Sequence, residues 1–383
     1  MRTLLKKIIY SLPIKFLLQN IILLESNPDY CDNAYYIYKE LLRRGINKKY
    51  KIIWVVNDMK PFANINIKNV YFLDRHKKLK FWYYNMFSKY ILDCNQYIYK
   101  KNKHQFRIHL GHGSPLKMAY AYVMGIGKFD YYITISDFFK NYFEDLFKDI
   151  DCEGKIYVSG FPRNDGLFHP EPVELYPKIK RKKTILWFPT FRNHKSTNKD
   201  DIVTHSKCHF EYGVPCVNTK KEMTDLNNYL KKNNTLLIIK NHPAEDMSKF
   251  NVLNLSNIVL LDKKYENNDI KFYDILSACD ALITDYSGIY YDYLLTRKPL
   301  GLAISDLDEY KSRVTLAFDN YYDYVKGNYL YNVSDIKQFI KNVIEDKDIK
   351  NEEREKALKR YHKYIDGDSS KRVVDLLIQN MER

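Results

Sequence analysis

The residue best suited to chemistry is a histidine that stands between two glycines. His112 lies in the stretch 111–117 (GHGSPLK), directly after the strand-like segment 107–110. Flanking glycines allow a sharp turn that leaves the imidazole exposed, and a neutral histidine can take a proton from a hydroxyl near pH 7. We expect Ser114 and Lys117 to open the next helix and to face an anion there. The alternative is a capped helix start without chemistry, which explains the paired glycines less well.

Two proline-containing turns place arginines at the ends of expected strands. Arg163 lies in the motif GFPRND, and Arg192 ends the motif FPTFR, which also carries Thr190. A guanidinium in such a place can hold a phosphate through two parallel hydrogen bonds. We therefore count Arg163, Thr190 and Arg192 as candidate substrate-binding residues. For each arginine, a structural salt bridge explains the sequence equally well.

A second histidine and a serine-glycine pair follow later strands. His242 comes after the apolar segment 236–239 and before a proline, which holds its backbone extended. Its position repeats that of His112 in the second half of the chain. In the motif TDYSG, Ser287 and Gly288 are expected to open a helix whose N-terminus receives a phosphate. Asp285 is expected to cap that helix or to accept a hydrogen bond from a donor hydroxyl.

Apolar segments alternate with helical patterns along most of the chain, which is typical of parallel α/β layers. The expected strands are 21–24, 52–56, 70–73, 90–93, 106–110, 131–135, 155–158, 184–188, 236–239, 258–261, 281–284 and 300–303. The expected helices are 32–44, 219–232, 269–279, 286–296, 335–345 and 351–382. Neither a glycine-rich dinucleotide motif after the first strand nor a P-loop occurs, which argues against both enzyme classes.

A proline-rich, basic stretch at 166–183 divides the chain and is expected to link two domains. We predict Rossmann-like domains at 21–165 and 184–345, with terminal helices at 346–383. The fold class is therefore α/β, with two facing Rossmann-like domains. A ligand is expected at the carboxyl ends of the strands, between the domains.

Bulk composition limits the class of protein and its partners. The chain has 383 residues, 45% of them apolar, and a formal charge of +15, which favours anionic partners such as nucleic acid, anionic lipid or phosphate-bearing substrates. The 6 cysteines form no Cys-x-x-Cys pair, which is typical of a reducing cytoplasm. No apolar run reaches the length of about 20 residues that spans a bilayer, and no signal peptide is expected.

The segment 1–20 is basic, contains no acidic residue and carries apolar side chains at helical spacing. Such a pattern predicts either a helix lying in a membrane surface or a helix docked on the protein's own core, and the pattern favours neither. If the membrane contact lies elsewhere, the stretch 75–84 is the alternative, because basic and aromatic residues adjoin there.

Taken together, these motifs resemble the CDP-glycerol:poly(glycerophosphate) glycerophosphotransferase family, the teichoic-acid primases and polymerases. The shared motifs are the E-S and D-N pairs at 25–26 and 32–33, HGSPLK at 112–117, GFPRND at 160–165, FPTFR at 188–192, NHP at 241–243, TDYSG at 284–288 and KP at 298–299. The resemblance covers about residues 21–330. Gly288 departs from the family pattern, which usually has a second serine there, and this leaves the identity of the polyol open.

The resemblance implies a GT-B fold and attack by an acceptor hydroxyl on the donor's β-phosphorus, with release of CMP. It makes His112 and His242 the active-site histidines and assigns phosphate binding to Ser287 beside Asp285. It implies an N-terminal acceptor domain and a C-terminal CDP-donor domain, and it implies no metal and no cofactor. The expected partners are a CDP-polyol donor, with glycerol first and ribitol as the alternative, a lipid-linked glycan acceptor and an anionic membrane surface. The expected location is the cytoplasmic face of the cell membrane.

Two other functions compete with this expectation. A nucleotide-sugar glycosyltransferase could share the fold, but the two histidines together with TDYS are absent from the usual sugar-transfer motifs. A nucleic-acid-binding protein would explain the charge of +15. Because basic residues are spread along the chain and form no known DNA- or RNA-binding motif, we expect no nucleic-acid partner.

Overall fold

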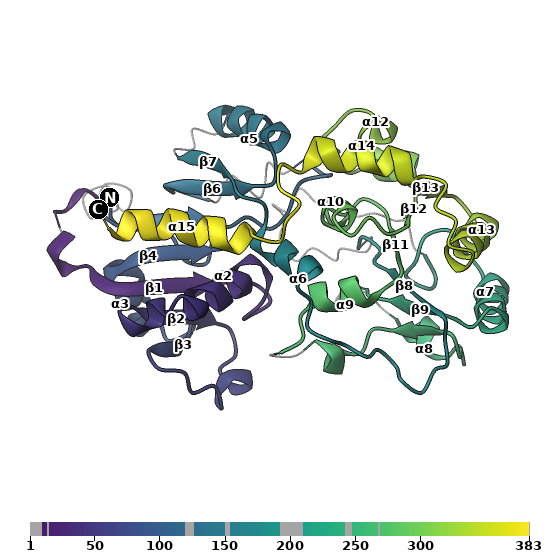
Figure 1. The fold of residues 1–383 in the computed structure, drawn as a ribbon, viewed down its shortest axis with the longest axis horizontal. Coiled ribbons are helices and arrows are strands. Elements are labelled where there is room, and N and C mark those ends of the chain that lie inside the picture. The colour runs from purple at the N-terminus through teal and green to yellow at the C-terminus, as the bar shows by residue number, and fades with distance from the viewer. Residues whose placement is uncertain are drawn as a thin grey trace. The chain divides into compact units, whose positions relative to one another are not determined.

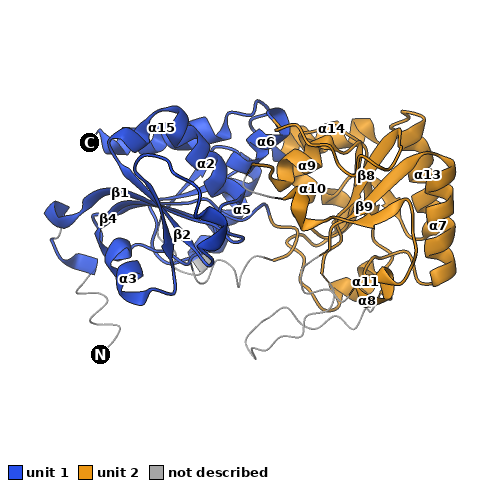
Figure 2. Cartoon of the chain, turned by 90° about the horizontal axis from the view of Figure 1, so that it is seen from below, with its two compact units in different colours: residues 1–114, 120–169, 361–383 blue, residues 115–119, 170–360 orange. Residues whose placement is uncertain are grey.

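The computed structural model describes residues 10–13, 15–118, 126–149, 154–191, 210–241, 247–266 and 269–382. The chain forms two compact units, each built on its own parallel sheet (Figures 1 and 2). Unit 1 comprises Met1–Ser114, Tyr120–His169 and Tyr361–Arg383, and unit 2 comprises Pro115–Ala119 and Pro170–Arg360. The boundary after His169 falls inside the stretch 166–183 that was predicted as a linker.

Unit 1 contains a parallel sheet in the order β3-β2-β1-β4-β5-β6-β7. Its strands are β1 (Gln19–Glu25), β2 (Lys51–Val56), β3 (Val70–Asp74), β4 (Ser88–Asp93), β5 (Phe106–His109), β6 (Tyr131–Thr134) and β7 (Lys155–Val158). Its helices are α2 (Asp32–Arg43), α3 (Lys78–Phe87), α5 (Asp137–Asp149), the short α6 (Asp165–Phe168) and α15 (Ser369–Met381). The central strands are apolar on both faces because helices cover both sides of such a sheet.

Unit 2 repeats this arrangement with a sheet in the order β10-β9-β8-β11-β12-β13. Its strands are β8 (Lys183–Trp187), β9 (Thr235–Ile239), β10 (Ile258–Leu260), β11 (Ala281–Thr284), β12 (Leu300–Ala303) and β13 (Asn328–Leu330). Its helices are α7 (Lys220–Lys232), α8 (Ser248–Asn251), α9 (Phe272–Ala278), α10 (Ile289–Leu294), α11 (Leu307–Lys311), α12 (Tyr321–Tyr324), α13 (Val333–Ile344) and α14 (Asn351–Tyr361). Strand β13 was not predicted because its three residues include no apolar run.

In both sheets the strand order reverses beside the first strand of the unit. The reversal lies between β1 and β4 in unit 1 and between β8 and β11 in unit 2. In parallel α/β sheets, the loops at the carboxyl ends of strands flanking such a reversal are where ligands bind. The motifs predicted to do chemistry follow β5 and β7 in unit 1 and β8, β9 and β11 in unit 2.

The C-terminal segment differs from the single helix predicted over 351–382. The segment between α14 and α15 turns at Gly367, whose φ is +71°, a backbone conformation that favours glycine. Helix α15 then packs on unit 1, where the backbone N–H groups of Ser369 and Ser370 donate to the Asp165 carboxylate at 2.9 and 2.8 Å. The predicted block 346–383 is therefore shared between the two units.

The described part of the N-terminal segment lies against unit 1. Asn102 donates to the carbonyl of Leu12 at 2.9 Å, and the N–H of Lys103 donates to the carbonyl of Tyr10 at 2.9 Å. Residues 15–17 form a short 3-10 helix, η1, and β1 begins at Gln19, inside the segment predicted as 1–20. Residues 1–9 and 14, which carry most of the predicted amphipathic pattern, lie outside the described residues.

A buried polar network lies near the carboxyl ends of the central strands of unit 1. Asp93 accepts hydrogen bonds from two guanidinium nitrogens of Arg107 at 2.8 and 2.7 Å, and its Oδ2 lies 2.9 Å from Nδ1 of His109. Glu25 lies opposite Asp93 in the register of β1 and β4. Burial and the neighbouring Asp93 charge raise the pKa of the Glu25 carboxyl to about 8.

The Glu25 proton predicts a pH dependence of stability. The folded protein keeps this proton where the unfolded chain has released it, so the free energy of unfolding should fall as pH rises between the two pKa values. Glu25→Gln removes the linkage. Between pH 5 and pH 8, urea unfolding should show the wild type losing about 2–4 kcal/mol relative to this variant. The exposed Glu144→Gln is the control, and parallel pH profiles for wild type and Glu25→Gln would contradict the assignment.

Candidate active site

His112 is paired with a buried aspartate in unit 1. Its Nδ1 lies 2.9 Å from Oδ2 of Asp32, the first residue of α2, while the histidine side chain remains 52% exposed. The Asp32 carboxylate is held on its other side by Nη1 of Arg163, 2.9 Å from Oδ1. Three segments that are distant in sequence therefore meet at one carboxylate: the start of α2, the loop after β5 and the turn after β7.

The charge of Asp32 decides which nitrogen of His112 can act as a base. Burial opposes the charge, but the Arg163 guanidinium and the His112 ring hold the pKa of the Asp32 carboxyl well below its ordinary value. An ionised carboxylate only accepts hydrogen bonds, so the proton in this contact belongs to Nδ1 of His112. In the neutral ring, the lone pair is then on Nε2, which is the arrangement that a general base requires.

Neighbouring backbone groups fix the same geometry. The side-chain amide of Asn33 donates to the carbonyls of Leu110 and Gly111 at 2.9 and 3.2 Å and accepts from the N–H of Arg163 at 3.1 Å. Gly113 has a φ of +129°, and a Cβ at this position would lie 2.8 Å from Nη2 of Arg163. A larger residue would strain the backbone and displace the guanidinium from Asp32.

The structure gives Arg163 a partner within the protein. Its side chain is only 8% exposed, and besides Asp32 it donates to the carbonyl of His112 at 3.2 Å. Of the two explanations left open by the sequence, these contacts favour the salt bridge. Arg163 acts on His112 through Asp32, which makes it a positioning residue.

The stretch after His112 differs from the helix start that was predicted. Ser114, Pro115, Leu116 and Lys117 contain no helical residue, and Lys117 instead forms an antiparallel β-bridge with Leu316. The prediction that Ser114 and Lys117 open a helix is therefore wrong, because this stretch is extended against the loop at 315–317. Ser114 is 3% exposed, and its hydroxyl has no hydrogen-bond partner among the described residues.

In unit 2, Asp285 joins the loops after β8 and β11. Its carboxylate accepts hydrogen bonds from the hydroxyl of Thr190 at 2.6 Å, from the N–H of Thr190 at 3.0 Å and from the N–H of Tyr286 at 2.6 Å. Tyr321 donates to the carbonyl of Asp285 at 2.8 Å. Because Asp285 is fully buried, its carboxylate fixes the shape of the two loops that flank the reversal of strand order.

Ser287 and Gly288 lie where the sequence placed them, before α10. Gly288 is the residue before the helix, and the hydroxyl of Ser287 accepts from the N–H of Ile289 at 3.4 Å. The helix is shorter than predicted: it covers Ile289–Leu294 instead of 286–296, and all of its residues are buried. Phosphate binding by Ser287 stays a prediction.

Two predicted site residues, Arg192 and His242, lie outside the described residues. The residues just before His242 are described: Lys240 follows β9, forms an ion pair with Glu266 at 2.5 Å and lies over the Phe272 ring. In the described ranges, no group of three or more histidine, cysteine, aspartate or glutamate side chains could hold a metal ion.

Residues 6–379 match the family described as CDP-Glycerol:Poly(glycerophosphate) glycerophosphotransferase. The chain belongs to this family. The ordered motifs of the sequence predict this membership, and the match confirms it. Asp32, which pairs with His112, belongs to the D-N motif, and Arg163, which pairs with Asp32, belongs to the GFPRND motif.

Relatives within the family differ in length and in the polyol that their names mention. The chain is 29% identical over 233 residues to the teichoic acid ribitol-phosphate polymerase TarL of Staphylococcus aureus, covering 58% of this chain and 37% of TarL. It is 24% identical over 386 residues to a teichoic acid poly(glycerol phosphate) polymerase of Bacillus spizizenii, covering 92% and 90%. The matches span between 37% and 53% of the length of three ribitol-phosphate relatives.

Solved structures show the same fold. The wall teichoic acid polymerase TagF superposes with a TM-score of 0.67 at 18% identity, covering 98% of this chain and 93% of TagF. A putative UDP-N-acetylglucosamine 2-epimerase from Listeria monocytogenes gives a TM-score of 0.53 at 11% identity, covering 95% and 97%. The predicted α/β fold of GT-B type, with two Rossmann-like units, is thereby confirmed.

Sequence reasoning missed the role of Asp32. It noted the residue only as part of a short D-N motif, because its partners are 80 and 131 positions away in the chain. A signal did exist: an Asp-Asn pair directly after the first strand of a Rossmann-like domain lies beside the reversal of strand order, where polar side chains are exposed to ligands.

The His112–Asp32 pair yields a direct prediction. In Asp32→Asn, the amide can donate to Nδ1, which favours the tautomer with the proton on Nε2 and removes the base. Asparagine tolerates the positive φ of 54° at this position. The kcat for release of the nucleotide product should fall by about two to four orders of magnitude. The melting temperature should also fall, because the buried Arg163 guanidinium loses its counter-charge, so kcat is measured well below that temperature. Asp145→Asn, on the exposed surface of α5, is the control, and a near-normal kcat in Asp32→Asn would refute the role.

The Thr190–Asp285 contact predicts a loss of stability. Thr190→Val removes one hydrogen bond to the buried carboxylate and should lower the free energy of unfolding by about 1–3 kcal/mol in urea titrations. Asp285→Ala should cost more, since it leaves the N–H groups of Thr190 and Tyr286 without this acceptor. Thr224→Val is the matched control, because the hydroxyl of the exposed Thr224 donates to the carbonyl of Lys220 within α7. If Thr190→Val costs no more than this control, Asp285 does not lock the two loops.

Proposed function

We propose that the chain transfers a polyol phosphate from a CDP-activated donor to a hydroxyl of a cell-envelope glycan or polymer and releases CMP. Glycerol phosphate is the first candidate. The observation that carries the proposal is the His112–Asp32 pair in a member of this family: a histidine whose Nε2 lone pair is set by a buried, ionised aspartate. This pair is suited to removing a proton from an attacking hydroxyl.

The reaction balances as a single displacement at phosphorus. The acceptor oxygen attacks the β-phosphorus of the CDP-polyol while its proton passes to Nε2 of His112. A new P–O bond forms to the acceptor, the bond from phosphorus to the bridging oxygen breaks, and CMP leaves with the electron pair. The Asp32 carboxylate then faces an imidazolium, whose charge it stabilises.

Donor binding is assigned to unit 2. Thr190, Ser287 and Gly288 lie in loops beside the reversal of strand order, and Asp285 holds two of these loops together. Arg192 and His242 are proposed to balance the charge of the pyrophosphate, a task that a metal ion performs in other phosphotransferases. EDTA should therefore leave turnover unchanged.

The names of the relatives support two polyols. Two ribitol-phosphate polymerases align over 58% of the chain at 27–29% identity, and two glycerol-phosphate polymerases align over 92% of it at 24% identity. We favour glycerol because those alignments extend over nearly the whole chain. CDP-ribitol is the alternative donor.

Substrate assays with separate donors decide between these functions. Purified protein is incubated with CDP-glycerol, CDP-ribitol or a UDP-sugar, together with a lipid-linked acceptor, and the nucleotide product is identified. We expect CMP from CDP-glycerol, reduced about 10²–10⁴-fold in His112→Ala. If only CDP-ribitol yields CMP, the transferred group is ribitol phosphate instead of glycerol phosphate. UDP from the UDP-sugar, with no CMP, would identify a glycosyltransferase and refute the proposal.

A lipid-linked acceptor would place the reaction at the cytoplasmic face of the cell membrane, and we propose a peripheral association there. Among the helices that the structure describes, none is long and apolar enough to cross a bilayer. The basic segment 1–20 remains a candidate for the contact. The carbonyls of Tyr10 and Leu12 accept hydrogen bonds from Lys103 and Asn102 of unit 1. A deletion that tests this segment should therefore end at residue 9.

A further inference from the structure

Helix α3 of unit 1 exposes an apolar stripe to solvent. Leu79 is 86% exposed, Trp82 52% and Tyr83 41%. These positions are spaced i, i+3 and i+4, so they share one face of the helix. Phe81 and Tyr84 point the other way and pack on a core to which β1, β2, β3 and β4 contribute. The helix is therefore anchored through one face and leaves a second apolar face uncovered by the described residues.

Positive charge flanks this stripe, and negative charge is absent from it. Lys78 and Lys80 are both exposed and lie about 100° to either side of Leu79 around the helix axis. The sequence from 75 to 92 contains one arginine and four lysines but no aspartate or glutamate. Long lysine side chains beside an apolar stripe can keep their charge in water while the stripe is buried.

The stripe extends to the segment that leads into β1. Gln19 donates from its amide to the hydroxyl of Tyr83 at 2.5 Å, which places the start of β1 beside α3. Just before it, Phe16 and Leu17 of η1 are 82% and 45% exposed. The apolar surface thus combines two elements that are more than 60 residues apart in sequence. We name Phe16, Leu17, Leu79, Trp82 and Tyr83 the α3 face.

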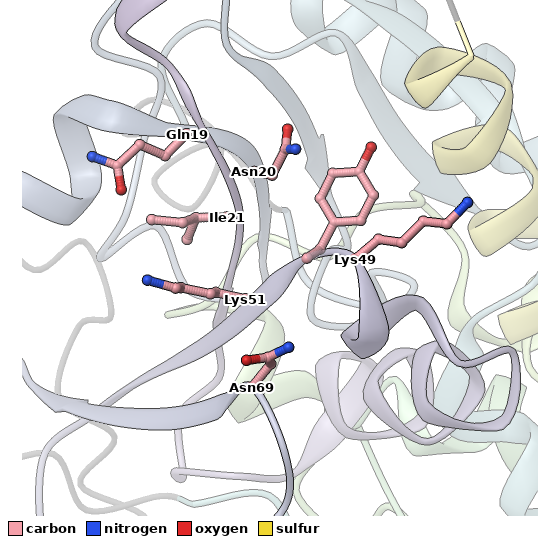
Figure 3. A pocket seen from close by; sticks show the side chains of 7 residues that line it. Gln19, Asn20, Ile21, Lys49, Lys51 and Asn69 are labelled. Carbon is pink, nitrogen blue, oxygen red and sulfur yellow. The ribbon is translucent and has the colours of Figure 1, made fainter.

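A basic pocket adjoins the α3 face. It has a volume of about 210 Å³ and is lined by Gln19, Asn20, Ile21, Lys49, Tyr50, Lys51 and Asn69 (Figure 3). The lining contains two lysines and three side-chain amides but no carboxylate. Lys51 points to the same side as Gln19, whereas Lys49 points away from them (Figure 3), so Lys51 and the Gln19 amide can meet an anion together. Gln19 belongs both to this pocket and to the contact with Tyr83. Gln19 therefore joins the pocket to the α3 face.

We propose that this surface docks on an anionic bilayer, with the α3 face in the interfacial layer and Lys51 on a phospholipid phosphate. Tryptophan and tyrosine favour the membrane–water interface, and flanking lysines are attracted by anionic headgroups. A second copy of the chain is a poor occupant because the same positive surface would meet itself. The docking is independent of the transfer reaction and of residues 1–9.

Trp82 provides a built-in probe. Of the three tryptophans, Trp54 and Trp187 are fully buried, and only Trp82 is exposed. Adding vesicles of phosphatidylglycerol to the full-length chain should shift tryptophan emission to shorter wavelength, and brominated acyl chains should quench it. Vesicles of phosphatidylcholine should bind at least about tenfold more weakly. Sedimentation with the anionic vesicles without any shift or quenching would place the contact elsewhere and overturn the proposal.

Substitutions test each part of the surface. Leu79→Glu should weaken vesicle binding by about tenfold or more, and Lys51→Gln should reduce the preference for anionic lipid. Val252→Glu, at an equally exposed apolar position in unit 2, is the matched control. CMP release with a water-soluble acceptor should be unchanged in all of them, so failed docking can be told apart from a failed transfer function. If Leu79→Glu abolishes a concentration-dependent dimer and leaves vesicle binding intact, the occupant is a second copy.

Discussion

The arrangement of unit 1 depends on keeping one carboxylate charged in a place with little water. Asp32 is almost fully buried, yet Arg163 on one side and His112 on the other keep it ionised. A buried charge is costly unless it is paired and hydrogen-bonded. The loops after β5 and β7 and the start of α2 are thus held together by an electrostatic requirement. The same requirement sets the tautomer of the one exposed member, His112.

Unit 2 also contains a buried aspartate, Asp285, which has a different role. Among the described residues, its carboxylate accepts hydrogen bonds from the N–H and hydroxyl groups of Thr190 and from the N–H of Tyr286. These contacts show that its carboxylate shapes the loops after β8 and β11. Asp32 and Asp285 thus have different roles, although both are buried acids near the carboxyl ends of β-strands.

Much of the fold could be predicted because it is encoded locally. Each apolar run from Ile21–Leu24 to Leu300–Ala303 became a strand, since buried parallel strands need such runs. Helix α3 was missed because its many aromatic residues cover both faces and hide the helical period. Ser114 and Lys117 were predicted at a helix start but lie in an extended segment, because a partner at Leu316, nearly 200 residues away, outweighs local preference. The Asp32–Arg163 ion pair could not be predicted either, because its two residues are 131 positions apart in the chain and meet only in the folded protein.

The order of segments along the chain has a consequence for how the protein is made. Unit 1 needs α15, which contacts α2 through the Arg44–Asp375 ion pair and binds Asp165 through its first two backbone N–H groups. All of unit 2 is therefore synthesised before the last helix of unit 1 leaves the ribosome. The nascent chain carries a sheet lacking its final covering helix while unit 2 already has every element that it requires. Premature termination just before Ser369 would thus spare unit 2 and leave the N-terminal unit open, a state in which chaperones and proteases would meet exposed apolar surface.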